Sequence, residues 1–253
     1  MHPASIVVLV VLSLVVLSFV TVLLVGMGKG SFSTRKVRPG SVYSCGGHVR
    51  QVPRGLVFHF TPYFVKEEHR NKLLGLFREM TTLFEKHGIT YWITAGTLLG
   101  ALRHGGFVPW DDDVDLAVLQ DQRKDLEALP WHEHGMNLVV RHGDTSVHFH
   151  RAKHAYPYID LVYATEHADR KMHFSADYDA KYPGEVWPKE WIFPVRKLPF
   201  ETLRVCAPNQ ARRCVLHNYG ETALHEVKAR NRWERFLPWI FNRRMAMISG
   251  IHD

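Results

Sequence analysis

Four aspartates near the middle of the sequence have the residue type and spacing of a metal-binding site. They are Asp111, Asp112, Asp113 and Asp115, at the entrance to an apolar run (residues 114–119) that predicts a β-strand. Because alternate side chains of a strand share a face, we expect the carboxylates of Asp113 and Asp115 to point the same way. Such carboxylates repel each other unless a cation lies between them. Oxygen ligands of this kind favour Mg²⁺, or Mn²⁺, over zinc.

A further acidic residue, Asp160, lies inside a second apolar run. Residues 158–163 predict another strand, and Asp160 is its only charged residue. An isolated buried carboxylate is costly, so Asp160 needs a cation or a hydrogen-bonded niche. The alternative is that Asp160 lies at a strand end or faces solvent.

The segment before the aspartates must position them. Residues 91–95 predict a short buried strand, Gly96 and Thr97 a turn, and the chain from near Leu98 a short helix. Two glycines and a proline end this helix, at positions 105, 106 and 109. Gly96 would allow a close backbone approach, and the first helical N–H groups, with the Thr97 hydroxyl, would offer donors to phosphate oxygens.

Other periodic segments predict the surrounding elements. A long helix with one apolar face is expected from about Lys66 to Lys86, stopped by Gly88. A short helix is expected over residues 121–129, and a β-hairpin is expected from residues 137–141 and 146–150.

The stretch from Gly96 to Asp115 resembles the LicD family, which includes bacterial phosphocholine transferases and the fukutin-related proteins. The Gly-Thr turn, Trp110 and the spacing of the aspartates carry the resemblance. It implies the α+β fold of nucleotidyltransferases, a mixed β-sheet packed with helices. Residues 198–205 and 208–220 resemble the family's carboxy-terminal strand pair and the helix that follows it.

The resemblance also implies an activity: Mg²⁺-dependent transfer of a phospho-substituent, phosphocholine- or ribitol-phosphate-like, from a CDP-linked donor to a sugar hydroxyl of a glycan or glycoconjugate. The implied catalytic and metal-binding residues are Asp113, Asp115 and Asp160, of which Asp160 would also take the acceptor's proton. The implied substrate-binding residues are Gly96, Thr97, Arg103 and His104, with Arg103 and His104 on the loop side.

The amino-terminal part of the chain predicts a membrane anchor. Residues 6–25 carry no charge and are long enough to cross a bilayer, whereas a secretory signal would have a shorter apolar core. We therefore expect an anchor (1–28), a basic stem (29–57) and a catalytic domain (58–253), in a single-pass membrane protein. The basic residues after the span favour a cytosolic catalytic domain, whereas fukutin-related proteins face the Golgi or ER lumen. We expect the lumen.

The distribution of charge argues against a nucleic-acid partner. The net charge is +7, and residues 29–54 contain six basic and no acidic residues. Removing these six charges leaves +1 for residues 55–253, since residues 1–28 carry none. A nearly neutral catalytic region is a poor match for a polyanion.

Two other functions remain open from the sequence. One is a nucleotide-adding enzyme of the same fold that acts on RNA, and the other is a membrane-tethered partner protein that has lost catalysis. Three cysteines give no metal-ligand spacing, although Cys206 and Cys214 could form a disulfide in an oxidising lumen.

Overall fold

The computed structural model describes most of the predicted catalytic domain. It covers residues 63–109, 111–141, 144–149 and 157–224, together with the backbone of short strands at 34–36, 42–45, 48–51, 226–227 and 245–246. The predicted anchor and Trp110 lie outside the described residues. No helix within the described residues is long and apolar enough to cross a membrane.

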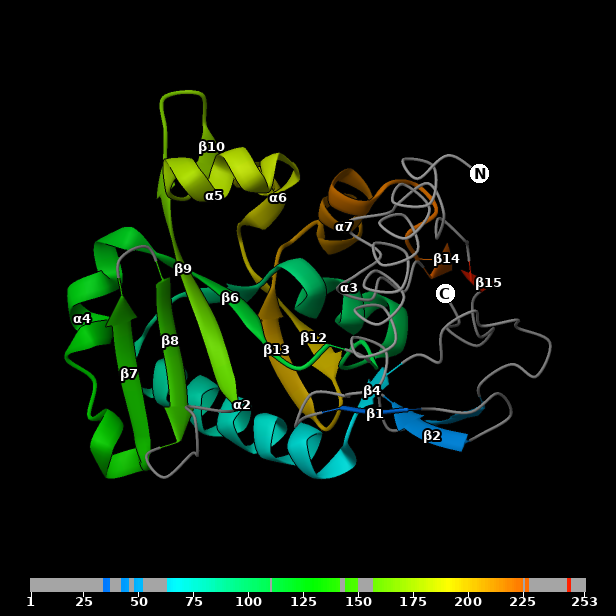
Figure 1. The fold of residues 1–253 in the computed structure, drawn as a ribbon. Helices are drawn as coiled ribbons and strands as arrows, with labels where there is room; N and C mark the ends of the chain where they lie inside the picture. Colours follow the sequence, from blue (N-terminus) through cyan, green and yellow to red (C-terminus); the bar gives the residue numbers. More distant parts are fainter. Residues whose placement is uncertain are drawn as a thin grey trace, which may run out of the picture.

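A mixed sheet of seven strands forms the centre of the described domain (Figure 1). Its strands are β5 (Tyr91–Ile93), β6 (Asp115–Leu119), β7 (Met136–Arg141), β8 (Asp144–Phe149), β9 (Tyr158–Glu166), β10 (Lys171–His173) and β11 (Trp187–Pro188). Strand β6 pairs antiparallel with β5 and parallel with β9. Strand β9 also pairs antiparallel with β8 and β10, while β7 and β11 extend the sheet by pairing with β8 and β10.

Helices and a second strand pair surround this sheet. The helices are α2 (Glu67–His87), α3 (Ala95–His104), α4 (Arg123–Glu127), α5 (Ala176–Lys181), α6 (Lys189–Ile192) and α7 (Ala211–Tyr219), with 3₁₀ turns η1 (Gln120–Gln122), η2 (Trp131–His134) and η4 (Pro183–Glu185). Strands β12 (Arg196–Phe200) and β13 (Leu203–Ala207) form a separate hairpin. In Figure 1, α2 runs below the sheet and α5 and α6 lie above it.

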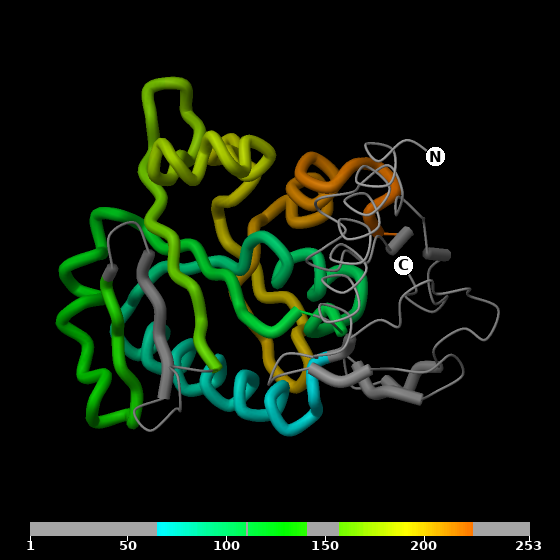
Figure 2. Tube along the Cα trace, in the orientation of Figure 1, coloured from blue at the N-terminus to red at the C-terminus, as the bar shows by residue number. Residues whose placement is uncertain are grey.

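Three further strand pairs are short. They are β1 (Thr34–Lys36) with β4 (Tyr63–Val65), β2 (Val42–Cys45) with β3 (His48–Gln51), and β14 (Glu226–Val227) with β15 (Met245–Ala246). The tube in Figure 2 follows the described chain from α2 to the end of α7 and shows that these two helices lie on opposite sides of the domain. All the described helices, the central sheet and the hairpin β12–β13 thus fall between residues 63 and 224.

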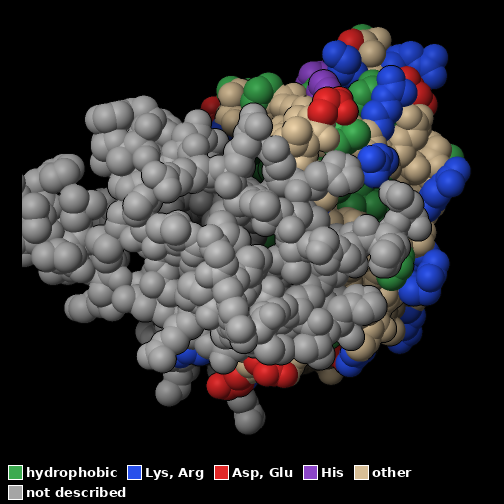
Figure 3. Space-filling view, turned by 90° about the vertical axis from the view of Figure 1, so that its right-hand side faces the viewer, with side chains coloured by type: hydrophobic (Ala, Val, Ile, Leu, Met, Phe, Trp, Pro, Cys, Tyr) green, Lys and Arg blue, Asp and Glu red, His purple; other side chains and the backbone are tan. Residues whose placement is uncertain are grey.

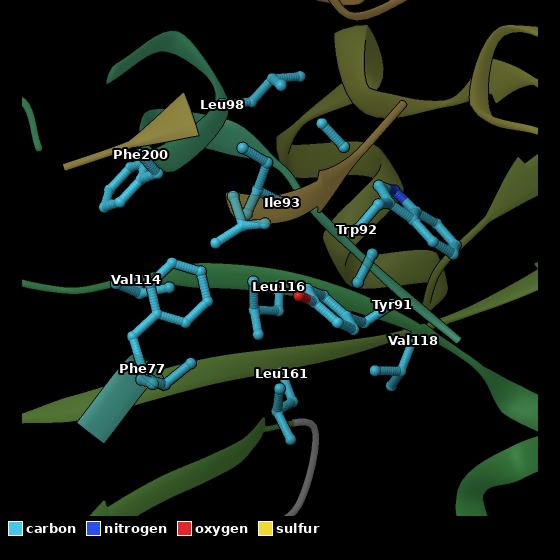
Figure 4. Packing of buried hydrophobic residues seen from close by; sticks show 14 of the residues in the cluster. Phe77, Tyr91, Trp92, Ile93, Leu98, Val114, Leu116, Val118, Leu161 and Phe200 are labelled. Atoms are coloured by element: carbon cyan, nitrogen blue, oxygen red, sulfur yellow. The ribbon is translucent and has the colours of Figure 1, made fainter. Parts of the chain in front are cut away.

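The apolar face of α2 builds the core against the sheet. Its buried residues recur at three- and four-residue spacing, as the sequence predicted: Leu73, Leu76, Phe77, Met80, Leu83 and Phe84. Figure 4 shows the Phe77 ring beside Val114, Leu116 and Leu161 of the two central strands. The helix ends at Gly88, whose φ of 67° is readily adopted only by glycine.

Most predicted elements are confirmed within a few residues. The long helix, the hairpin of β7 and β8, strand β9 and the pair β12–β13 all form. One boundary was wrong: α3 begins at Ala95, three residues before Leu98. Ala95 adopts a φ of 43°, so a single residue makes the turn from strand to helix. Cys206 and Cys214 are both free thiols, so the proposed disulfide is absent.

Candidate active site

The register of the two central strands places two of the predicted aspartates side by side. Parallel pairing of β6 with β9 sets Asp115 opposite Asp160, and the Asp160 N–H donates to the Val114 carbonyl over 2.8 Å. Paired residues of neighbouring strands share a face of the sheet. Because Leu116 lies on the α2 side, Asp115 and Asp160 lie on the opposite side.

Asp113 joins this pair from the bend that precedes β6. Ligand oxygens of Asp113, Asp115 and Asp160 all lie within 4.8 Å of one another, and the three residues are partly buried. We call these three carboxylates the acidic centre. They converge, although Asp113 lies just before the strand rather than within it.

The turn between β5 and α3 holds the backbone of Asp115 from both sides. The Thr94 N–H donates to the Asp115 carbonyl over 3.1 Å, and the Asp115 N–H donates to Thr97 Oγ1 over 2.8 Å. Thr97 was predicted to bind phosphate, but it is buried and its hydroxyl supports the backbone of Asp115. The local fold of this turn thus fixes where the Asp115 carboxylate points.

Gly96 provides space for a fourth carboxylate. A Cβ atom at this position would lie 2.3 Å from Asp111 Oδ2, well inside van der Waals contact. Gly96 therefore does allow a close approach to its backbone, as predicted, but the group that approaches it is the Asp111 carboxylate. Asp111 in turn shares a side-chain hydrogen bond with Asp113.

Burial and mutual repulsion make these carboxylates hard to ionise. Burial is the main cause that raises the pKa of Asp115 well above its ordinary value, and the charges of Asp113, Asp111, Glu185 and Asp160 raise it further. Burial and the charge of Asp113 likewise raise the pKa of Asp111. The pKa of Asp113 is also raised, mainly by burial. A cation among these carboxylates would offset their repulsion and favour the ionised form.

Glu185, which lies in η4, is a residue of the site that the sequence did not predict. Its carboxylate accepts hydrogen bonds from Thr94 Oγ1 at 2.7 Å and from the Tyr178 hydroxyl at 3.2 Å, and it also accepts one from the Ala95 N–H. Its carboxylate therefore binds the N-terminus of α3, where the sequence had suggested phosphate. Burial raises the pKa of Glu185, while these hydrogen bonds oppose the rise.

Arg103 and His104, which were expected on the loop side of the helix as donor-phosphate contacts, lie inside the domain. Both belong to the last turn of α3 and are buried, each with 4% of its surface exposed. Arg103 Nη1 donates to the Ala223 carbonyl over 3.1 Å, and Arg103 Nε lies 3.4 Å from His104 Nδ1. The Arg103 charge also lowers the pKa of Asp111, so Arg103 helps to balance the carboxylates.

The acidic centre fits a divalent metal ion. Three carboxylates from two neighbouring strand entrances offer oxygen ligands only, the donor set that Mg²⁺ and Mn²⁺ prefer. Burial, followed by the neighbouring negative charges, raises the pKa values of Asp113 and Asp115, so the site disfavours charged carboxylates without a cation. A bound cation would offset this effect.

Comparison with known proteins identifies the domain that carries this centre. Residues 88–210 match the sequence profile of the LicD/FKTN/FKRP nucleotidyltransferase domain. These residues form a nucleotidyltransferase domain of the LicD/FKTN/FKRP family. The matched residues contain the turn, α3, the acidic centre and Glu185, so the LicD domain is a transferase with the nucleotidyltransferase fold.

Several relatives resemble this LicD-family chain over part of their length. Human ribitol 5-phosphate transferase FKRP is 28% identical over 182 residues, covering 66% of this chain and 36% of that protein. Lipopolysaccharide cholinephosphotransferase LicD of Haemophilus influenzae is 44% identical over 55 residues, 21% of each protein. A solution structure of the antibiotic-resistance factor ANT(2'')-Ia covers 55% of this chain and 66% of its own, with 14% identity and a TM-score of 0.40.

The LicD-family chain matches only part of its curated relatives. The matched regions span 45%, 53% and 36% of the length of two Rickettsia proteins and human FKRP. This chain therefore spans about half or less of the length of these relatives.

Proposed function

We propose that this protein transfers a phospho-substituent from a CDP-linked donor to a sugar hydroxyl of a glycan or glycoconjugate. The substituent is of the phosphocholine or ribitol-phosphate kind. The observation that carries the proposal is the convergence of Asp113, Asp115 and Asp160 within a LicD-family domain. Relatives named as a cholinephosphotransferase and a ribitol 5-phosphate transferase support the two choices of substituent.

The acidic centre would hold Mg²⁺ or Mn²⁺ through the carboxylates of Asp113, Asp115 and Asp160. When bound, the metal supplies positive charge for the donor diphosphate and for the charge that develops on the leaving CMP. Thr94 and Thr97 fix the backbone of Asp115, so its carboxylate needs little rearrangement to receive the ion. Asp160 is also the proposed acceptor of the proton from the sugar hydroxyl.

The predicted donor contacts are part of the same proposal. Gly96, Thr97, Arg103 and His104 lie on α3, which begins beside Asp115 and ends at the buried Arg103–His104 pair. In this proposal α3 orients the donor mainly by positioning the acidic centre. Arg103 contributes positive charge close to Asp111.

Release of CMP tests the proposed reaction. The full-length protein is incubated with Mg²⁺, CDP-choline or CDP-ribitol, and a panel of glycan acceptors, and CMP is measured together with the mass of the acceptor. We expect CMP and an acceptor heavier by the phospho-substituent for one donor, and neither product after EDTA treatment. Transfer of a nucleotide to the acceptor would contradict the proposal.

We also propose that the protein is tethered to a membrane by residues 1–28, with the catalytic domain in the Golgi or ER lumen. The uncharged run and the family resemblance support this location. Protease treatment of sealed microsomes tests it, because a lumenal domain is protected until detergent is added. Digestion of the domain in intact microsomes would instead place it in the cytosol.

A further inference from the structure

A groove with a positive lining lies away from the acidic centre, and we infer that it binds phosphate groups. Its volume is about 650 Å³, and its walls come from α6, β12 and α7. Three arginines line it, Arg196, Arg212 and Arg213, against a single carboxylate, Glu221, among the described lining residues. Three positive charges less one negative charge leave +2.

The two sides of α7 separate the groove from the acidic centre. Successive residues of an α-helix are 100° apart, so residues 212, 213 and 216 share one side and residues 211, 214 and 215 the other. The first group lines the groove, whereas Cys214 and Val215 are buried and do not line it; Ala211 is buried at the groove's edge. On its inner side α7 packs against α3 and against η4, which carries Glu185. The groove is thus a second site, one helix diameter of about 10 Å from the elements that hold the acidic centre.

One arginine of the groove is held in place before any ligand arrives. The Arg213 guanidinium lies 4.1 Å from the centre of the Trp191 ring, and Arg213 Nη1 donates to Gln210 Oε1 over 3.1 Å. His217 contacts the same ring edge-on, with centroids 5.6 Å apart. Gln210 Nε2 donates to the Glu190 carbonyl over 3.4 Å. These contacts reduce the entropy that Arg213 would lose on binding a ligand.

The positive charges of the two other arginines are not neutralised by a described ion pair. Within the part of the chain that the structure describes, neither Arg196 nor Arg212 has an ion pair or hydrogen bond with a described partner. They come from β12 and α7 and so face the groove from two different elements. Lys and Arg side chains are also frequent among the described residues exposed on the face shown in Figure 3.

This combination suits a phosphate ester. The planar guanidinium forms paired hydrogen bonds to phosphate oxygens, and three of them around one groove match a tetrahedral anion better than a flat one. The volume lies within the range of small-ligand sites and exceeds what a free phosphate ion fills, so the ligand carries the phosphate on a larger body. That body is a phosphorylated sugar or the headgroup of a phospholipid, and both present the same chemical group.

Binding measured without divalent cations tests the inference, because the acidic centre then repels anions. The full-length protein in a non-ionic detergent is titrated by calorimetry with glucose 1-phosphate, and separately with micelles of the same detergent that contain phosphatidic acid. Glucose and micelles without the lipid serve as uncharged controls. Binding of glucose 1-phosphate assigns a soluble phosphate ester, and binding of the lipid micelles alone assigns a headgroup.

A double variant and a matched control make the result decisive. Arg196→Gln with Arg212→Gln should weaken binding about tenfold or more, since each removes a charge-assisted contact to phosphate. Lys86→Gln with Lys124→Gln removes the same charge from other surfaces and should leave binding unchanged. Equal binding by the groove variant and the wild type, or no binding of either phosphate probe, would overturn the inference. Because no turnover is measured, the result is independent of the proposed transfer reaction.

Discussion

The acidic centre and the more exposed carboxylates around His173 are both clusters of charge, but they are balanced differently. His173 lies between two carboxylates, with its Nε2 3.2 Å from Asp169 Oδ2 and its Nδ1 3.0 Å from Asp179 Oδ2. Lys171 adds a second positive charge 3.8 Å from Asp169. The hydrogen bond from His173 is the main cause that lowers the pKa of Asp169. This cluster contains its own cations.

The acidic centre lacks such balance. Burial and neighbouring negative charges raise the pKa of Asp115, and every influence named for this group acts in the same direction. A cluster that neutralises itself is explained by folding alone, because His173 ties β10 to the start of α5. A cluster that remains short of positive charge is unstable by itself and is explained by an external cation. The difference between the two is therefore the physical case for a metal site.

The largest expected effect comes from removing a carboxylate of the acidic centre. Asp115→Asn should lower transfer by about 10³-fold or more, since it deletes a ligand that supports several kcal/mol of charge stabilisation. The fold should persist, because an ionised Asp115 is unfavourable in its buried position. Turnover and the melting temperature without metal are the measurements. Loss of turnover together with a collapse of the melting temperature would make Asp115 a structural residue.

The matched control for this variant is in the other cluster. Asp169→Asn removes a carboxylate of similar type that pairs with His173. It should leave transfer unchanged and affect only stability. Equal losses of turnover in both variants would contradict the distinction between the clusters.

The second prediction concerns metal and pH together. Mg²⁺ at 100 times its Kd should stabilise the folded protein by about 2.7 kcal/mol. Without metal, stability should rise as the pH falls from neutral, because carboxyls with raised pKa values take up protons in the folded state before the unfolded state does. Asp115→Asn should weaken both responses, as followed by thermal melting across pH. A rise in metal-free stability with increasing pH would show that the acidic centre is already balanced.

Periodicity and residue type predicted the helix and the strands that carry the acidic centre. The three- and four-residue spacing of apolar residues gave α2, and the apolar runs around Asp115 and Asp160 gave two strands of the sheet. The register between these two strands could not be predicted, and this register places Asp115 opposite Asp160. The pairing of one strand with another depends on the whole sheet and leaves little trace in either segment.

Residues whose contacts lie far away in the sequence could not be predicted for a similar reason. Glu185 lies in a three-residue turn without periodicity, and it reaches Thr94 only because the segment between β10 and β11 returns to the turn before α3. The burial of Arg103 depends on the Ala223 carbonyl, 120 positions later. The early start of α3 follows from the positive φ of Ala95, which no residue preference indicates.

The third prediction concerns the negative charge of Glu185. Glu185→Gln keeps an oxygen that can accept hydrogen bonds from Thr94 and the Ala95 N–H, but it removes a negative charge that acts on Asp115. We expect Mg²⁺ affinity to fall about tenfold, or ~1.4 kcal/mol, with little change in melting temperature. Calorimetric titration with Mg²⁺ measures this, and Glu190→Gln on the exposed side of α6 is the control. Unchanged affinity would mean that Glu185 only anchors the turn.

The smallest expected effect lies in the self-balanced cluster. Burial opposes the charged form of His173, but its hydrogen bonds to Asp169 and Asp179 outweigh this, so the His173 pKa is raised above its ordinary value of 6.5. A raised histidine pKa adds stability that is fully present below pH 6.5 and is lost as the pH rises through the folded-state pKa. His173→Gln should therefore cost up to about 1 kcal/mol at pH 5.5 and less at pH 8. Chemical denaturation at the two pH values measures the difference. A larger loss of unfolding free energy at pH 8 would show that His173 contributes as a neutral ring. The positive charge of His173 would then not be what neutralises the two carboxylates.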